Sequence, residues 1–420
     1  MRMNRLCTLA LGIAYLACSA PAALMAQTPV AATPAPAPVA EAPAPPPNPL
    51  AGIVGVLGGV NLTGLVDGYY SYNNNHPSVG IGGTANEPFT FTNGNISLNL
   101  LELQLDKPVD KTTPLGFRVA VAWGQAINAV NNGNGDIAST LPGAAQYLKE
   151  GYFSYFAPVG KGLQLDVGKF VTSAGAEVIE SNQNWNYSRS LLFYYGIPYY
   201  HMGLRAKYTF NDKWSATGFL VNGWNNVVGT NSGKTVGVSI GWNATKKVTL
   251  TETYLAGPRD LAHDGNNGPW NHLSDTVLAY TPNAKLSLQA NLDYDRQEEF
   301  GPLNKPADYA GIAAYVKYQA TPTVAVVGRY EYFNDHAGLA TLNHLGSPVF
   351  IGSNTVGPHL NEFTGTVEKR VAGHLLTRLE YRHDGSNQDF FGSGKVANSV
   401  KDQSTVQAGL IFVLEPEPAK

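Results

Sequence analysis

Apolar and polar residues alternate with a period of two in segment after segment between residues 60 and 413. The segment Leu286–Asp295 is the clearest: Leu, Ala and Tyr occupy its even positions, and Ser, Gln, Asn and Asp its odd ones. Successive side chains of a strand point to opposite faces, so the pattern predicts strands with one apolar and one wet face. About sixteen such segments occur, a number typical of a large barrel. They lie near 60–73, 95–107, 115–126, 146–157, 162–170, 200–210, 213–223, 234–243, 247–256, 273–281, 285–296, 308–319, 323–333, 360–369, 373–383 and 403–413.

The connections between these segments differ in length on the two sides. Every second connection is a short turn, such as 211–212 or 282–284, whereas the alternate ones span roughly 10 to 29 residues. This asymmetry is typical of an outer-membrane barrel with both chain ends on the short-turn side. An even number of strands closes the sheet without a free edge, as a bilayer requires. We therefore predict an all-β fold: a transmembrane antiparallel up-and-down β-barrel over 51–413, with a tail at 414–420.

Charged residues are scarce and segregated. Of 420 residues, 28 are Lys or Arg and 31 are Asp or Glu, so 14% are charged, against roughly 25% in soluble domains. On the strands these charges occupy the polar face. A charge on the lipid face of a barrel costs ~2–4 kcal/mol at mid-bilayer, which explains the segregation. A soluble β-sandwich is the alternative, but its outer face should carry Lys and Glu. The net charge of -3 excludes a basic nucleic-acid binder, so no nucleic acid is expected as a partner.

Three segments break the alternation. Glu252 shares the apolar face of its segment with Tyr254. The apolar face switches between Leu100 and Leu101, which a β-bulge would explain. The segment around Glu150 is apolar on both faces. The register is therefore least certain at these places.

Aromatic residues gather on the apolar face near both ends of the predicted strands. Trp242 and Tyr280 lie beside short turns, and Tyr70 and Tyr72 lie beside a long loop. Amphipathic rings prefer the two membrane interfaces, so these residues predict two aromatic belts.

Residues 1–26 have the layout of a secretory signal: a basic start, an apolar stretch and small residues, with cleavage expected after Ala26 or Ala22. The apolar stretch is too short for a membrane anchor. Both cysteines, Cys7 and Cys18, fall in this leader. Catalysis, metal binding or disulfide formation by cysteine is therefore not expected of the exported chain.

Residues 27–50 form a distinct segment that contains nine prolines, mostly separated by alanine. This composition favours extended polyproline II and cannot build a core. We expect a disordered tether here. A semi-rigid spacer that touches the cell wall or a partner is the alternative.

Motifs of enzymatic chemistry are lacking in the sequence. The nine histidines form no HxxxH or HExxH pattern, and no GxSxG, P-loop or dinucleotide fingerprint occurs. We therefore expect no cofactor, no metal site and no enzymatic activity. A barrel hydrolase using His201, His383 and Asp384 near the rim is a minor alternative.

Six segments spread over residues 60–412 resemble the OmpL-like β-barrel porin family of Gram-negative bacteria. They are Val66–Tyr70, Gly168–Phe170 with Gly175–Glu177, Asn186–Ser190, Asn222–Asn225, Arg329–Tyr332 and Arg378–Asp384. The resemblance implies a water-filled channel in the bacterial outer membrane for passive diffusion of small hydrophilic solutes or ions. Expected partners are outer-membrane lipids, those solutes and a second copy of the chain in a homo-oligomer. A non-conducting structural or adhesive barrel is the alternative.

The last predicted strand carries an assembly signal. Val406–Phe412 alternates apolar residues into a final aromatic and is similar to the C-terminal sorting signal of barrel proteins. The barrel assembly machinery is therefore an expected partner.

The longest connection, 171–199, is unusually apolar for an external loop. By analogy with general porins, whose third long loop folds inward, we expect it to enter the lumen and form the pore constriction. Opposite charges on the two sides of a constriction would orient dipolar solutes and select among ions by their charge. The alternative is that the wall charges form ion-pair ladders between strands. The proposed constriction residues are acidic Glu177 and Glu180, and basic Arg189, Arg118, Arg205, Arg329, Arg378 and Arg382.

Overall fold

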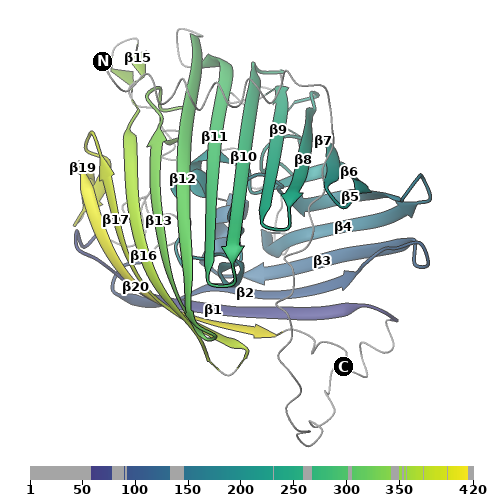
Figure 1. The fold of residues 1–420 in the computed structure, drawn as a ribbon. Helices are drawn as coiled ribbons and strands as arrows, with labels where there is room; N and C mark the ends of the chain where they lie inside the picture. The colour runs from purple at the N-terminus through teal and green to yellow at the C-terminus, as the bar shows by residue number, and fades with distance from the viewer. Residues whose placement is uncertain are drawn as a thin grey trace, which may run out of the picture.

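The chain folds into a single closed antiparallel β-barrel (Figure 1). The computed structural model describes residues 58–77, 89, 92–132, 146–229, 231–258, 267–300, 305–341, 350–351, 354–355, 357–371, 373–394 and 396–414. The predicted signal peptide, the tether and residues 415–420 of the predicted tail lie outside these ranges. None of the helices within them is long and apolar enough to span a membrane.

Sixteen strands form the barrel wall, each paired antiparallel with its neighbours in chain order, and β1 pairs with β20 to close the ring. The predicted barrel and its number of strands are thus confirmed, and every predicted segment overlaps one strand. The strands are β1 (Asn61–Asn73), β2 (Asn95–Lys107), β3 (Leu115–Trp123), β4 (Leu148–Ala157), β5 (Leu163–Val171), β6 (Tyr200–Asn211), β7 (Trp214–Val221), β8 (Thr235–Thr245), β9 (Val248–Pro258), β10 (Trp270–Asn283), β11 (Leu286–Phe300), β12 (Lys305–Thr321), β13 (Val324–Asn334), β16 (His359–Val371), β17 (Leu375–Ser386) and β20 (Asp402–Leu414).

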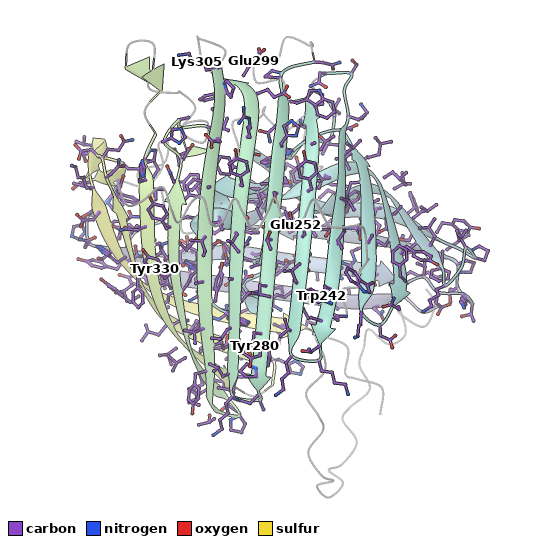
Figure 2. The ribbon with its side chains drawn as sticks, turned by 45° about the horizontal axis from the view of Figure 1, so that its top comes forward. Trp242, Glu252, Tyr280, Glu299, Lys305 and Tyr330 are labelled. Carbon is purple, nitrogen blue, oxygen red and sulfur yellow. The ribbon has the colours of Figure 1, made fainter. Side chains whose placement is uncertain are left out.

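Alternation along the strands separates a lipid face from a lumen face. On β17, Leu379 is 59% exposed, whereas its neighbour Glu380 is 1% exposed and points inward. The four belt residues Tyr70, Tyr72, Trp242 and Tyr280 are all exposed large side chains on the outer face. Figure 2 places Trp242 and Tyr280 toward the short-turn end of the wall.

The connections follow the predicted asymmetry with one exception. β11 and β12 continue well beyond their predicted ends and leave four residues, 301–304, between them, where a longer loop was expected. Their paired ends carry Glu299 and Lys305 above the neighbouring strands (Figure 2). The residues at these ends are charged and polar, so the apolar alternation that identifies a strand does not extend to them.

Other long connections contain small elements that the alternation did not predict. These are α3 (Gln125–Asn132), the short helices η2 (Ser181–Gln183) and η3 (Leu192–Gly196), and the hairpins β14 (Phe350–Ile351) with β15 (Asn354–Thr355) and β18 (Phe391–Ser393) with β19 (Val396–Val400).

Two β-bulges explain the irregular segments near the start of the barrel. On β2, Asn99 is an extra residue between the pairs Leu98–Gly68 and Leu100–Asp67, so the predicted bulge is confirmed. On β4, Lys149 is extra between the residues that pair with Val121 and Ala120. Lys149 and Glu150 are consequently both buried. Both faces of the segment look apolar because aromatic side chains occupy both: Tyr152 is buried, and Phe153 is 77% exposed on the outer face.

An arginine on the lipid face should destabilise the barrel. Leu379→Arg places a charge on the outer surface of β17, so we expect the free energy of unfolding in lipid vesicles to fall by ~2–4 kcal/mol. Urea titration of the refolded protein measures this value. The control is Gln289→Arg on the lumen face of β11, which should cost far less. Equal losses for the two variants would contradict the assignment of faces.

Candidate functional site

The connection between β5 and β6, residues 172–199, lies inside the barrel. Its backbone and side chains form hydrogen bonds with inward-facing residues of strands all round the wall, from β1 through β9–β13 to β16 and β17. As expected from the sequence, the loop has entered the lumen.

Wall carboxylates and amides accept the loop's backbone N–H groups. Glu380 on β17 accepts from Tyr187 at 2.6 Å and from Ser188 at 2.9 Å. Glu331 on β13 accepts from Leu191 at 2.8 Å. On the adjoining part of the wall, Asp275 accepts from Gly175 and Asn291 from Ala176, both at 2.8 Å. These last two bonds fix the start of the loop against β10 and β11.

Wall arginines donate to the loop's carbonyl oxygens. Arg378 donates to the carbonyls of Ser181 at 2.5 Å and of Asn186 at 3.0 Å. Arg382 donates to the carbonyl of Arg189 at 2.6 Å. The loop's irregular backbone is thus hydrogen-bonded by side chains, which satisfies groups that a strand or helix would pair internally.

Glu177 and Arg329 form the central ion pair between loop and wall, with 2.9 Å between Glu177 Oε1 and Arg329 Nη1. Arg329 also donates to the carbonyl of Ser188 at 2.9 Å and pairs with Glu362 on β16 at 3.0 Å. The Arg329 side chain has no exposed area. Here opposite charges touch directly and do not face each other across open water.

The second predicted loop carboxylate binds the opposite part of the wall. Glu180 pairs with Lys149, the bulge residue of β4, which also donates to Glu102 on β2 at 2.7 Å. Burial would raise the pKa of Glu180, but the adjacent ammonium outweighs it and holds this pKa below its ordinary value. Glu180 therefore stays ionised at neutral pH.

Arg189 stays within the loop. It donates to the carbonyls of Val178 at 2.9 Å, Tyr187 and Ile179, and its guanidinium lies 5.4 Å from the centre of the Phe89 ring. Its side chain therefore holds the two halves of the loop together, whereas its backbone carbonyl accepts from the wall residue Arg382.

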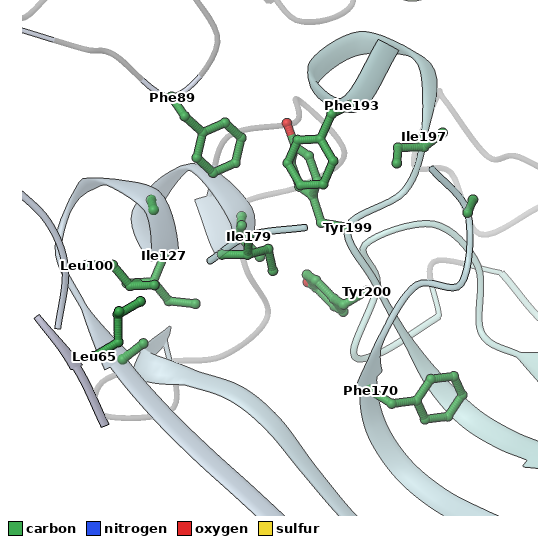
Figure 3. Packing of buried hydrophobic residues seen from close by; sticks show 14 of the residues in the cluster. Leu65, Phe89, Leu100, Ile127, Phe170, Ile179, Phe193, Ile197, Tyr199 and Tyr200 are labelled. Atoms are coloured by element: carbon green, nitrogen blue, oxygen red, sulfur yellow. The ribbon is translucent and has the colours of Figure 1, made fainter. Parts of the chain in front are cut away.

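Aromatic rings pack around the loop inside the barrel (Figure 3). The rings of Phe89 and Phe193 lie 5.4 Å apart, and Tyr199 contacts both at 5.7 and 5.4 Å. Ile127 of α3 and Leu100 of β2 belong to the same cluster. This burial of apolar side chains explains why the 171–199 segment is so apolar for a loop.

The remaining predicted arginines lie on the wall formed by β3–β6. Arg118 pairs with Asp106 at 2.8 Å, and Arg205 pairs with Asp166 at 2.7 Å. Lys207, next inward-facing on β6, is 3.0 Å from the same Asp166. The side chains of Arg118 and Lys207 are 32% and 38% exposed, so this part of the lumen is hydrated.

Ion pairs also form on the opposite wall, between adjacent strands, between strands two apart and within one strand. Arg378 on β17 pairs with Glu368 on β16 at 2.7 Å, and Glu368 pairs with Lys317 on β12 at 2.9 Å. Arg382 pairs with Asp384 at 2.7 Å. Arg378 and Arg382 also donate to loop carbonyl oxygens, so the same guanidinium groups make ion pairs along the wall and contacts with the loop.

Several residues of this network were not predicted as site residues. Asp67 on β1 accepts from the Tyr187 hydroxyl at 2.8 Å and from Asn99 at 2.6 Å. Lys149 was not recognised as a lumen residue, because the bulge on β4 interrupts the alternation there. Glu331 and Glu380 were recognisable as inward-facing charges, but alternation alone could not distinguish a carboxylate that binds the loop from one that pairs along the wall.

The residues of the hydrolase alternative are separated. Asp384 is buried on the lumen side and paired with Arg382, whereas the adjacent His383 is exposed on the outer side and lies 3.0 Å from Ser404. His201 is buried on β6 and contacts the carbonyl of Gly223 at 3.0 Å. These three residues form no catalytic set.

Solved structures of similar fold include outer-membrane proteins. OmpT of Vibrio cholerae in its trimer form has a TM-score of 0.51 at 10% identity, over 84% of this chain and 98% of that one. An anion-selective porin from Comamonas acidovorans has a TM-score of 0.51 at 9% identity, over 84% and 99%. The channel DcaP of Acinetobacter baumannii has a TM-score of 0.51 at 13% identity, over 84% and 97%. At such identities the likeness establishes the fold alone.

No curated protein matches the chain in sequence. The model of the family described as "Putative beta-barrel porin-2, OmpL-like" matches residues 59–414, which include all sixteen wall strands. The chain therefore belongs to this family of bacterial outer-membrane porins.

Proposed function

We propose that this porin conducts small hydrophilic solutes or ions through a lumen narrowed by the 171–199 loop. The observation that carries the proposal is the loop's attachment to strands all round the wall by buried charged side chains, while Arg118 and Lys207 remain exposed to water. A loop held by these contacts narrows the lumen, and its position does not depend on regular secondary structure of its own. We assign the protein no enzymatic activity.

The eight proposed constriction residues divide into two roles. Glu177, Glu180, Arg189, Arg329, Arg378 and Arg382 fix the loop, because their charges are paired or bonded to loop backbone. Arg118, together with Lys207, supplies charge to the hydrated part of the lumen, and the buried Arg205 supports this region by pairing with Asp166, which also pairs with Lys207. This second group would determine which ions and dipolar solutes pass.

A non-conducting structural barrel is the second candidate. The observation in its favour is the dense filling of the lumen by the loop and two clusters of buried apolar residues. Single-channel recording in planar bilayers distinguishes the two, since a porin gives discrete conductance steps. Silence of the purified, folded protein at all voltages would exclude the channel.

Removing a loop anchor should widen the channel. Glu380→Ala deletes the acceptor of two buried backbone N–H groups, each costing about 1–3 kcal/mol when left unpaired. We expect a larger and noisier single-channel conductance, with an intermediate value for Glu380→Gln. Gln289→Ala on the lumen face of β11 is the control and should conduct like the native protein. Unchanged conductance of a folded Glu380→Ala variant would contradict the constriction.

Removing an exposed lumen cation should shift ion preference. Lys207→Gln and Arg118→Gln each delete one positive charge from the hydrated wall, so the reversal potential in a KCl gradient should move toward cation preference. Lys234→Gln makes the same charge change at an exposed position before β8 and serves as the control. If all three variants shifted the potential equally, the selectivity would not arise at this wall.

A further inference from the structure

Two aspartates face each other on adjacent strands inside the barrel. Asp275 on β10 and Asp293 on β11 are direct partners in the ladder, and both side chains are buried on the lumen face. Like charges directly opposite each other destabilise a sheet. Removing a carboxylate from water is also unfavourable unless an opposite charge or hydrogen bonds compensate it. The pair therefore needs a positively charged partner or a full set of donors.

Few hydrogen-bond donors reach the aspartate pair. The amide nitrogen of Asn291 donates to Asp275 at 2.6 Å and to Asp293 at 2.9 Å, and the backbone N–H of Gly175 donates to Asp275 at 2.8 Å. Each carboxylate offers about four acceptor positions, so these bonds satisfy fewer than half of them. Oδ2 of Asp293 is buried and accepts no hydrogen bond within the described part of the chain.

The pair also differs from the other carboxylates of the lumen in its charged neighbours. Asp166 pairs with Arg205 at 2.7 Å, and Glu177 pairs with Arg329 at 2.9 Å. By contrast, the charged residues that act most strongly on Asp293 are Asp275 and Glu331, which are both acidic. No basic side chain of the described ranges forms an ion pair with either aspartate of the pair.

Both ends of the 171–199 loop meet the wall at this pair. The loop's start is held there, because Gly175 donates to Asp275 and Ala176 donates to Asn291. Near the loop's end, a Cβ atom placed on Gly196 would lie 2.7 Å from Asp293 Oδ2. Apart from Gly196 and its two chain neighbours, the next nearest atoms to that position are 3.7 Å away. Glycine thus leaves room for an ion beside the unsatisfied oxygen.

We propose that Asp275 and Asp293 bind a calcium ion between the wall and the two ends of the loop. A divalent cation neutralises both carboxylates, whereas a shared proton would neutralise only one. Calcium accepts six to eight oxygen ligands in flexible geometry, whereas magnesium demands a near-ideal octahedron and loses its water reluctantly. A buried and irregular set of oxygens therefore suits calcium better.

Only two carboxylates take part in this site. The described residues contain no group of three or more carboxylate, histidine or cysteine side chains that could hold a metal. The other ligands would therefore be peptide oxygens and water, which calcium accepts. Local sequence motifs predict no metal here, because Asp275 and Asp293 lie on different strands and only the ladder brings them together.

Calcium binding by the folded protein is the first test. The protein, refolded in uncharged maltoside micelles and stripped with a chelator, should bind one ion per chain when titrated with calcium chloride. Asp293→Asn keeps the oxygen that accepts from Asn291 but removes one charge. Its affinity should fall at least as far as on loss of an outer-shell partner, about 10–100-fold.

Asp308→Asn is the matched control for charge. Asp308 lies on β12 with its side chain 42% exposed, so this variant should bind calcium like the native protein. Absence of binding by the native protein, or equal affinity of Asp293→Asn and Asp308→Asn, would overturn the proposal.

Gly196→Ala tests the position of the ion and leaves both carboxylates in place. Its methyl group would occupy the space beside Asp293 Oδ2, whereas in Gly218→Ala on β7 the added Cβ meets no atom within 4 Å. A ligand that binds only the folded state raises its stability. Calcium should therefore raise the thermal unfolding midpoint of the native protein and of Gly218→Ala, and raise that of Gly196→Ala less. If the aspartates shared a proton and bound no ion, calcium would leave all three midpoints unchanged, and the proposal would fail.

A channel recording connects the site with the loop and rests on the proposed conduction. In bilayers of uncharged lipid, a chelator on both sides should release the loop ends, so native conductance should become larger and noisier than in calcium. Asp293→Asn should conduct alike in both solutions. Native conductance that ignored the chelator would overturn the ion's role in fixing the loop. A protein that bound calcium but carried no current would contradict the channel and support this site.

Discussion

Backbone pairing between β1 and β20 is the interaction on which the rest of the structure depends. A bilayer offers no water to unpaired N–H and C=O groups, so a sheet can cross it only when its first and last strands pair. β1 does so along most of its length, from Gly64 opposite Leu414 to Asn73 opposite Thr405. Once the ring is closed, each residue of a regular strand faces either lipid or lumen.

A ring of this size leaves an interior that its own wall side chains cannot fill, and the inserted loop uses that space. The loop has little regular structure, so its peptide groups need other partners. Wall carboxylates accept its N–H groups, and wall guanidiniums donate to its C=O groups. Where ions of opposite sign lie side by side, as Arg329 does beside Glu177 and Glu362, the buried charges compensate one another.

The sequence predicts the barrel well because apolar residues alternate with polar ones along every regular strand, and this alternation shows which side chains face lipid and which face the lumen. It predicts less of the site, since inward parity identifies Arg329 or Glu380 as lumen residues but says nothing of what they bind. That depends on the path of the loop, which is set by contacts between residues far apart in the chain, such as Tyr187 with Asp67. The extended ends of β11 and β12 were missed for a related reason: beyond the membrane both faces are wet, so alternation disappears.

The bulges at Asn99 and Lys149 shift the alternation of lipid-facing and lumen-facing side chains by one residue. Each adds one residue to its strand, so the strand beyond it returns to the correct face while two consecutive side chains point into the lumen. In each case the extra side chain joins the network around the loop, Asn99 through Asp67 and Lys149 through Glu180. A barrel can therefore gain a lumen side chain by inserting one residue, and its lipid-facing surface is left as it was.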